Sequence, residues 1–168
     1  ATSNQVNIHL FEKVTEVKSN STIKEVITTK GFYKAKNVVI ATGFYDIPNY
    51  IGVQGEELPK VAHYYNDPHY YATQKTIVVG ASNSAVDAAL EIYRKGGEVT
   101  MIVRAEDIGP RVKYWVRPDI VNRIEEGSIK AYFNSSIKEI KEKEVIVQTP
   151  DGETTLENDF VLLLTGYR

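Results

Sequence analysis

The chain has 168 residues, of which 42% are hydrophobic and 25% charged, as is typical of a globular protein with one ordinary domain or two small ones. Its 20 basic and 22 acidic residues give a formal net charge of −2, which argues against nucleic-acid binding. Because these residues include no cysteine, they hold no disulfide, thiolate metal site or cysteine nucleophile. No apolar run reaches the roughly 18 residues of a membrane span, and the N-terminus lacks signal-peptide features, so we expect a cytoplasmic protein without membrane contact.

The first part of the chain has the pattern of short strands. Three runs are rich in alternating or β-branched residues: 6–11, 24–29 and 32–36. Turns are expected at Asn20-Ser21 and Lys30-Gly31. Residues 37–43 contain a continuous apolar stretch that suits a strand buried on both faces. The pattern predicts a small antiparallel meander that ends in a buried strand.

Residues 44–73 contain several Pro, Gly and Tyr, which predicts an irregular connection between two domains and not a packed element. His63 and His69 lie in this stretch, next to pairs of tyrosines. Such an aromatic stretch suits the wall of a cofactor pocket. Tyrosine also commonly fills the packing between domains with its hydroxyl at the surface, and we favour this structural interpretation.

A βαβ pattern follows in residues 76–104. A short apolar strand ends at Gly80, and apolar residues with helical spacing then run from Val86 to Tyr93. Gly96-Gly97 closes this helix before a second apolar run, 98–103. We therefore expect two parallel strands joined by an amphipathic helix.

The rest of the chain predicts one helix and several strands. The helix begins near Pro118, a favoured first-turn residue, and ends at Gly127. Five strand-like runs follow, with a turn at residues 150–152: 129–133, 136–140, 144–148, 154–156 and 160–164. The predicted fold class is α/β, a Rossmann-like domain with a parallel sheet and a β-meander, preceded by a small antiparallel β segment.

A candidate phosphate-binding turn lies between the strand and the helix of the βαβ unit: Gly80-Ala81-Ser82-Asn83-Ser84-Ala85. Gly80 permits a tight turn, Ser82 offers a hydroxyl donor where a second Gly is usual, and Ala85 is small enough for close packing. The helix N-terminus then supplies N–H groups for a pyrophosphate. The alternative is that Gly80 and Ala85 only pack the unit and that residues 82–84 cap the helix. We favour dinucleotide binding.

The end of the second strand predicts which nucleotide is bound. An acidic residue there suits the ribose hydroxyl of NAD, whereas a basic residue suits the 2′-phosphate of NADP, and this chain has Arg104. Arg111 and Lys113 follow and are expected to converge on the same phosphate, although Glu106 and Asp107 dilute the positive charge. NADPH is therefore favoured over NADH. The alternative is that Arg104 is an ordinary solvated surface residue.

Three stretches in this order resemble the flavoproteins with two dinucleotide-binding domains that are related to thioredoxin reductase: 38–49, 80–88 and 165–167. Within that superfamily of pyridine nucleotide-disulfide oxidoreductases, four stretches are most similar to the YpdA-type bacillithiol disulfide reductases: 41–49, 59–64, 83–90 and 113–115.

This resemblance implies an NADPH domain inserted into an FAD domain through two chain crossings, Ala41-Thr42-Gly43 and Thr165-Gly166, both expected to contribute to cofactor binding. Residues 1–43 would then be the end of the first part of the FAD domain, 44–164 the NADPH domain, and 165–168 the start of the return crossing. The FAD fingerprint of the family would precede residue 1, and its second FAD motif would follow Arg168. We therefore expect this chain to be a fragment.

The resemblance further implies that the intact protein passes hydride from NADPH to FAD and on to a disulfide of a low-molecular-weight thiol or a thioredoxin-like protein, with a homodimer left open. Without catalytic residues or a metal site of its own, this chain is expected to bind NADPH but not to turn over. Two alternatives remain at this point. One is the NADPH domain of a flavin-dependent monooxygenase, and the other is a stand-alone nucleotide-binding or sensing module.

Overall fold

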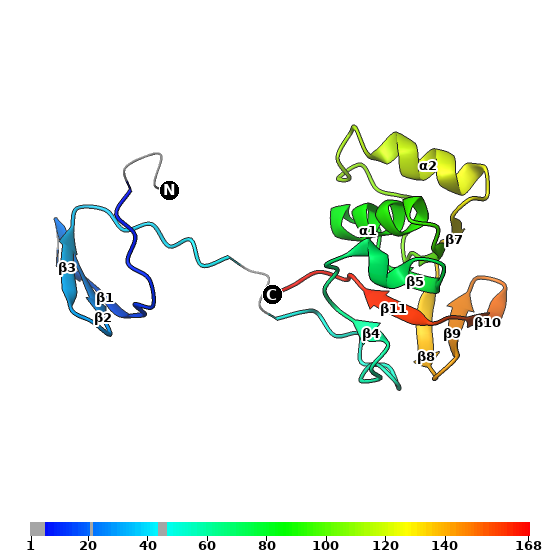
Figure 1. Cartoon of the computed structure of the whole chain (residues 1–168), viewed down its shortest axis with the longest axis horizontal. Helices are drawn as coiled ribbons and strands as arrows, with labels where there is room; N and C mark the ends of the chain where they lie inside the picture. The colour runs from blue at the N-terminus through cyan, green and yellow to red at the C-terminus, as the bar shows by residue number, and fades with distance from the viewer. Residues whose placement is uncertain (1–5, 21, 44–46) are drawn as a thin grey trace. The chain divides into compact units, whose positions relative to one another are not determined.

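The computed structural model describes residues 6–20, 22–43 and 47–168 (Figure 1). The chain divides into two compact units, Ala1–Gly43 and Phe44–Arg168. None of the helices in these described ranges is long and apolar enough to cross a membrane.

The first unit contains an antiparallel sheet with the strand order β1-β2-β3. Its strands are β1 (Val14–Asn20), β2 (Ile23–Thr28) and β3 (Phe32–Ala35). The predicted strands at 24–29 and 32–36 are confirmed, as is the turn at Lys30-Gly31, where the Thr28 N–H donates to the Gly31 carbonyl over 2.8 Å. For the turn predicted at Asn20-Ser21, Ser21 lies outside the described residues.

The prediction of a strand at residues 6–11 is wrong, because β1 begins three residues later. Phe11 has a φ of 54°, a left-handed conformation that ends any extended run at this point. Side-chain hydrogen bonds connect the end of this segment to the sheet instead: the Thr28 and Tyr33 hydroxyls both donate to the Glu12 carboxylate. These hydrogen bonds hold the pKa of Glu12 below its ordinary value.

The prediction of a buried strand at residues 37–43 is also wrong. The segment has no strand structure, and Val39 and Ile40 are 87% and 78% exposed. A strand needs neighbours for its N–H and C=O groups, and no strand in the described ranges pairs with this segment. Apolar sequence alone therefore does not make it a strand.

The second unit is built on a five-stranded sheet with the order β4-β11-β5-β6-β7, in which all neighbours are parallel. The strands are β4 (Val61–Ala62), β5 (Lys75–Val79), β6 (Glu98–Ile102), β7 (Lys130–Tyr132) and β11 (Phe160–Leu163). The parallel βαβ unit predicted from residue 76 onward is confirmed, with β5 and β6 joined by a helix.

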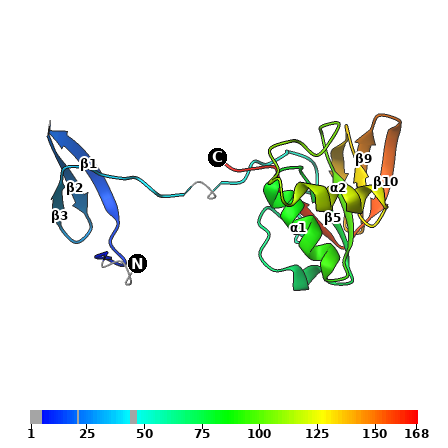
Figure 2. The same ribbon diagram turned by 90° about the horizontal axis from the view of Figure 1, so that it is seen from above.

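That helix, α1 (Asn83–Arg94), and a second one, α2 (Arg117–Glu125), lie on one side of the sheet (Figure 1). The view from above in Figure 2 shows both helices in front of the strands. Helix α1 ends as predicted: Gly96 has a φ of 82°, and the Gly97 N–H donates back to the Ile92 carbonyl over 3.0 Å.

The other side of the sheet is covered by an antiparallel meander, β10-β9-β8. It comprises β8 (Ser136–Ile140), β9 (Glu144–Thr149) and β10 (Gly152–Glu157), as the sequence predicts. Alternate residues of β5 point to opposite faces, so Val78 packs in the core beneath the helices while Ile77 and Val79 pack in the core against the meander. The unit therefore has three layers.

The interpretation of residues 44–73 as an unpacked connection is wrong for much of the stretch. Val61 pairs with Val161, so β4 forms an edge of the parallel sheet. A short 3-10 helix, η2 (Pro68–Tyr71), follows, and Tyr71 is buried in the core beneath α1. Residues 44–46 of this stretch lie outside the described residues.

Candidate functional site

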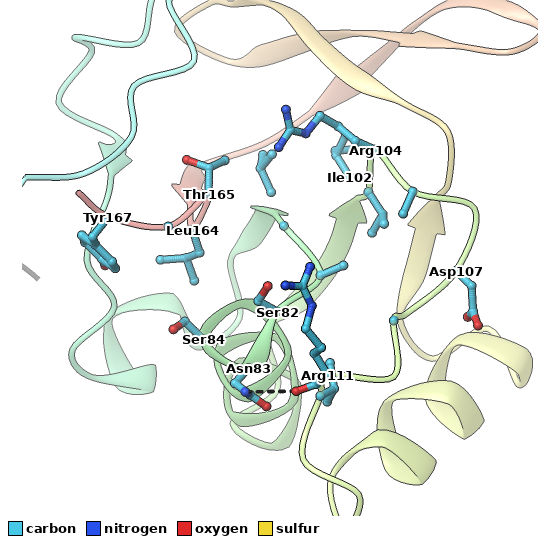
Figure 3. A pocket seen from close by; sticks show the side chains of 18 residues that line it. Ser82, Asn83, Ser84, Ile102, Arg104, Asp107, Arg111, Leu164, Thr165 and Tyr167 are labelled. Atoms are coloured by element: carbon cyan, nitrogen blue, oxygen red, sulfur yellow. Dashed lines mark hydrogen bonds between the residues drawn. The ribbon is translucent and has the colours of Figure 1, made fainter. Parts of the chain in front are cut away.

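A pocket of about 730 Å³ lies at the carboxyl ends of β5, β6 and β11 (Figure 3). Three segments line it, all within the second unit: 79–84, parts of 102–112, and 164–167. From β5 the chain continues to β6 on one side, while β11 returns on the other side. In open parallel sheets, ligands bind outside the carboxyl ends of the strands at such a point of reversal. The pocket is therefore the candidate site on topology alone.

Gly80 shapes the floor of this pocket. Its φ is 130°, and a Cβ atom there would lie 2.6 Å from the Leu164 carbonyl oxygen and 3.2 Å from the Ala85 Cβ. The Gly80 N–H donates to the Ile102 carbonyl over 3.1 Å, so this backbone joins the ends of three strands. The fold itself requires glycine here. This agrees with the alternative in which Gly80 packs the βαβ unit, and it is also compatible with nucleotide binding at the same turn.

Helix α1 begins at the pocket. Ser82 is its N-terminal flanking residue, with extended backbone angles of −91° and 177°, and no side chain of the described residues caps the helix. The alternative interpretation, in which residues 82–84 cap the helix, is therefore not what the structure shows. The first residues of the helix line the pocket (Figure 3), and the first-turn N–H groups have no acceptor within the helix. They are available to an anion.

Two arginines line the pocket from the β6 side. Both lie on the loop between β6 and α2, Arg104 near its start and Arg111 further along, and Figure 3 shows both side chains over the pocket. Among the described residues neither guanidinium has an ion-pair partner, although Arg94, Arg117 and Arg123 all do.

The carboxylate found among the described residues of the pocket lining is already paired. Asp107 accepts from the Arg117 guanidinium over 2.9 Å and from the Ile108 N–H over 2.6 Å. Figure 3 shows its side chain lying to the side of the pocket. The two arginines are thus the charged groups left to meet a ligand among the described residues that line the pocket.

Lys113, the third basic residue expected at the phosphate, does not line the pocket. Its ammonium lies 2.8 Å from the Asp87 carboxylate on α1, and its backbone N–H donates to the Asn83 side-chain oxygen over 2.8 Å.

Ala85, the last residue of the predicted turn, is fully buried beneath it, as close helix packing requires.

Residues 164–167 form the third wall. The Thr165 hydroxyl donates to the Asn49 carbonyl over 2.7 Å, and the Asn49 N–H donates to the Gly166 carbonyl over 2.9 Å. Tyr167 also lines the pocket, which the sequence analysis did not predict, and its hydroxyl donates to the His63 carbonyl over 2.8 Å. Its position directly after the predicted crossing was the available signal.

The aromatic stretch at residues 63–71 contributes no side chain to the lining of the pocket within the described residues. Tyr71 packs into the core, and the Tyr65 hydroxyl donates to the Glu91 carboxylate of α1 over 2.7 Å. Burial, followed by this hydrogen bond, raises the pKa of Tyr65. The structural interpretation of these tyrosines is supported.

The predicted site residues thus fall into three groups. Those that the structure brings together on the pocket are Gly80, Ala81, Ser82, Asn83, Ser84, Arg104, Arg111, Thr165 and Gly166. Ala85 and Lys113 lie on or beside α1 outside the lining. Residues 41–43 belong to the first unit.

Comparison with known proteins gives a consistent family. Residues 1–168 match the family described as pyridine nucleotide-disulphide oxidoreductase. The chain is 39% identical over 141 residues to bacilliredoxin reductase Bdr of Bacillus subtilis (strain 168), which covers 83% of this chain and 44% of that protein.

Solved structures agree with this match. The bacillithiol disulfide reductase Bdr (YpdA) from Bacillus cereus superimposes with a TM-score of 0.84 at 38% identity, covering 99% of this chain and 53% of that one. Thioredoxin reductase from T. acidophilum has the same fold, with a TM-score of 0.77 at 21% identity over 98% of this chain and 55% of that one. The chain therefore spans about half the length of these relatives.

Proposed function

Because this chain belongs to the pyridine nucleotide-disulphide oxidoreductase family, we propose that residues 44–164 form the NADPH-binding domain of a flavoprotein disulfide reductase. One observation carries the proposal: the uncapped start of α1 and two arginines without ion-pair partners among the described residues open onto the same pocket. A pyrophosphate suits the helix start, and a 2′-phosphate suits the arginines. This set of donors fits NADPH better than NADH, whose ribose has a hydroxyl in place of that phosphate.

Each part of the pocket has a role in this proposal. The turn at 80–85 holds the pyrophosphate with the backbone N–H groups of α1, and Ser82 adds a hydroxyl donor. Arg104 and Arg111, which both line the pocket, would hold the 2′-phosphate. The polar backbone of Thr165-Gly166 closes the third side, so these residues orient the nucleotide at the sheet edge.

The proposal extends to the intact protein. Residues 1–43 belong to an FAD domain, and Ala41-Thr42-Gly43 and Thr165-Gly166 are the two crossings between the domains. When bound, the cofactors supply hydride transfer from NADPH through FAD to a disulfide of a low-molecular-weight thiol or a thioredoxin-like protein. The relatives described above are named reductases, which favours this function over a monooxygenase domain or a sensing module.

Titration of NADPH and NADH into the full chain tests the proposal. Arg104→Ala should raise the Kd for NADPH by about 10- to 100-fold, because a charge-assisted contact to the 2′-phosphate is lost, and should leave the Kd for NADH nearly unchanged. Arg94→Ala is the matched control, since Arg94 pairs with Asp119 over 2.6 Å and does not line the pocket. Equal losses for both nucleotides, or no preference for NADPH in the wild type, would contradict the proposal.

A further inference from the structure

The loop between β6 and α2 is held against α1 by three polar contacts. The Asn83 side-chain oxygen accepts from the Lys113 N–H over 2.8 Å, and its amide donates to the Arg111 carbonyl over 3.4 Å (Figure 3). One helical turn further along α1, the Asp87 carboxylate pairs with the Lys113 ammonium over 2.8 Å. We call Asn83, Asp87 and Lys113 the loop latch.

Arg111 is the first of the points on the loop that the loop latch holds. Its carbonyl is one of those points, and the next is the N–H two residues later. Its guanidinium has no ion-pair partner among the described residues and lines the pocket. The latch therefore fixes the backbone of Arg111 and leaves its charge available.

The ion pair of the loop latch contributes little to holding the fold together. The Lys113 and Asp87 side chains are 40% and 34% exposed, and pairs at such positions stabilise a protein only weakly. The loop has apolar anchors of its own, because Ile108 and Val112 are both buried. The arrangement is thus better suited to orienting a neighbouring side chain than to stabilising the unit.

We propose that the loop latch positions Arg111 for the 2′-phosphate, so that Asn83, Asp87 and Lys113 raise the preference for NADPH over NADH without Lys113 touching the nucleotide. This inference rests on the proposed function of the pocket. A long arginine side chain loses less entropy on binding when its backbone is already fixed, so loss of the latch weakens the phosphate contact. Lys113 then acts as a positioning residue, in place of the phosphate ligand expected from the sequence.

Two single variants of the full chain separate the two roles of Lys113. If Lys113 bound the phosphate directly, Asp87→Ala would free its ammonium and maintain or strengthen NADPH binding, whereas Lys113→Met would weaken it. In the latch role, Asp87→Ala and Lys113→Met both raise the Kd for NADPH by about 5-fold and leave the Kd for NADH unchanged. Lys113→Arg, which retains the pair, restores wild-type binding.

The same titrations in an Arg111→Ala background complete the test. There, neither Asp87→Ala nor Lys113→Met should weaken NADPH binding further, because the side chain that the latch positions is gone. Circular dichroism checks that each variant is folded. Additive losses, equal losses for both nucleotides, or tighter NADPH binding by Asp87→Ala would overturn the latch role. If the wild type shows no preference for NADPH, or if Arg111→Ala does not weaken NADPH binding, then both the latch role and the proposed function of the pocket are contradicted. If those two hold and the latch variants bind normally, only the latch fails.

Discussion

Ser82, at the start of α1, makes no capping hydrogen bond to the helix. Ser82 is exposed, its backbone is extended, and its hydroxyl caps nothing among the described residues. A free N-terminus of this kind carries partial positive charge and unpaired N–H groups. A better capping residue would thus stabilise α1 and at the same time compete with any anion that binds there.

This competition gives a prediction in which stability and binding change in opposite directions. Ser82→Asp should raise the free energy of unfolding by about 0.5–1 kcal/mol, because a carboxylate caps the helix and interacts favourably with its dipole. The same charge should repel a pyrophosphate and weaken NADPH and NADH alike, by roughly 10-fold or more. Urea unfolding and nucleotide titration of the same sample measure the two effects.

Ser82→Gly is the control for this prediction. It removes the hydroxyl, adds no charge and restores the commoner residue of the motif, so both nucleotides should bind nearly as in the wild type. Unchanged affinities in Ser82→Asp would place the pyrophosphate away from α1, and the turn would then serve only to pack the helix on the strand.

The sequence predicts the residues of the pocket where they belong to one local pattern. Gly80, Ser82 and Arg104 lie at fixed positions of a βαβ unit, so the motif brings them to the ends of its strands. The Asn83–Lys113 contact joins residues 30 positions apart and depends on the path of an irregular loop. No periodicity encodes that path. The sequence therefore identified Lys113 as a basic residue near the site, but it could not show that the Lys113 ammonium pairs with Asp87.

At the scale of elements, β5 is the central support of the pocket. It lies between β11 and β6, and its residues 76–79 are buried on both faces, so polar side chains there are costly. Thr76 is 1% exposed, and its hydroxyl has no hydrogen-bond partner among the described residues. The strand therefore carries one uncompensated polar group next to a helix–sheet core.

Thr76→Val should stabilise the second unit by about 1 kcal/mol, because it replaces this hydroxyl with a methyl group of similar size. Val78→Thr is the matched reverse change: Val78 is fully buried two residues along the same strand, and a hydroxyl there should cost about 1–3 kcal/mol. Chemical unfolding of both variants gives the two values. A loss of stability in Thr76→Val would mean that the hydroxyl has a partner, such as a buried water molecule.

The elements predicted well are those that have a clear hydrophobic periodicity over their whole length and that pack or pair with a neighbouring element. The strands β5 and β6 and the helix α1 have strong periodicity and pair as the βαβ rule requires. The two-residue strand β4 has no periodicity to detect and exists only because Val61 meets Val161 of β11. The opposite error occurred at residues 37–43, where an apolar run has no strand to pair with in the described ranges.

At the scale of the whole molecule, the division into two units separates the two cofactor roles of the proposal. Every described residue that lines the pocket belongs to Phe44–Arg168, including both arginines and the proposed return crossing. The proposed FAD-domain segment and its crossing at residues 41–43 belong to Ala1–Gly43. If each unit carries its own function, NADPH binding should not need the first unit.

A chain shortened to residues 44–168 should therefore fold and bind NADPH with a Kd within about 2-fold of the full chain, because a compact unit with its own core folds by itself. Both hydrophobic clusters that enclose the parallel sheet lie within those residues, so the thermal midpoint of the main transition should also be retained. Calorimetry of both chains, with and without NADPH, measures midpoint and affinity together, and the Arg104→Ala form of the shortened chain controls for nonspecific binding. A folded short chain with NADPH affinity lowered 10-fold or more would show that residues 1–43 take part in the nucleotide site, and Ala41-Thr42-Gly43 would be the first segment to substitute.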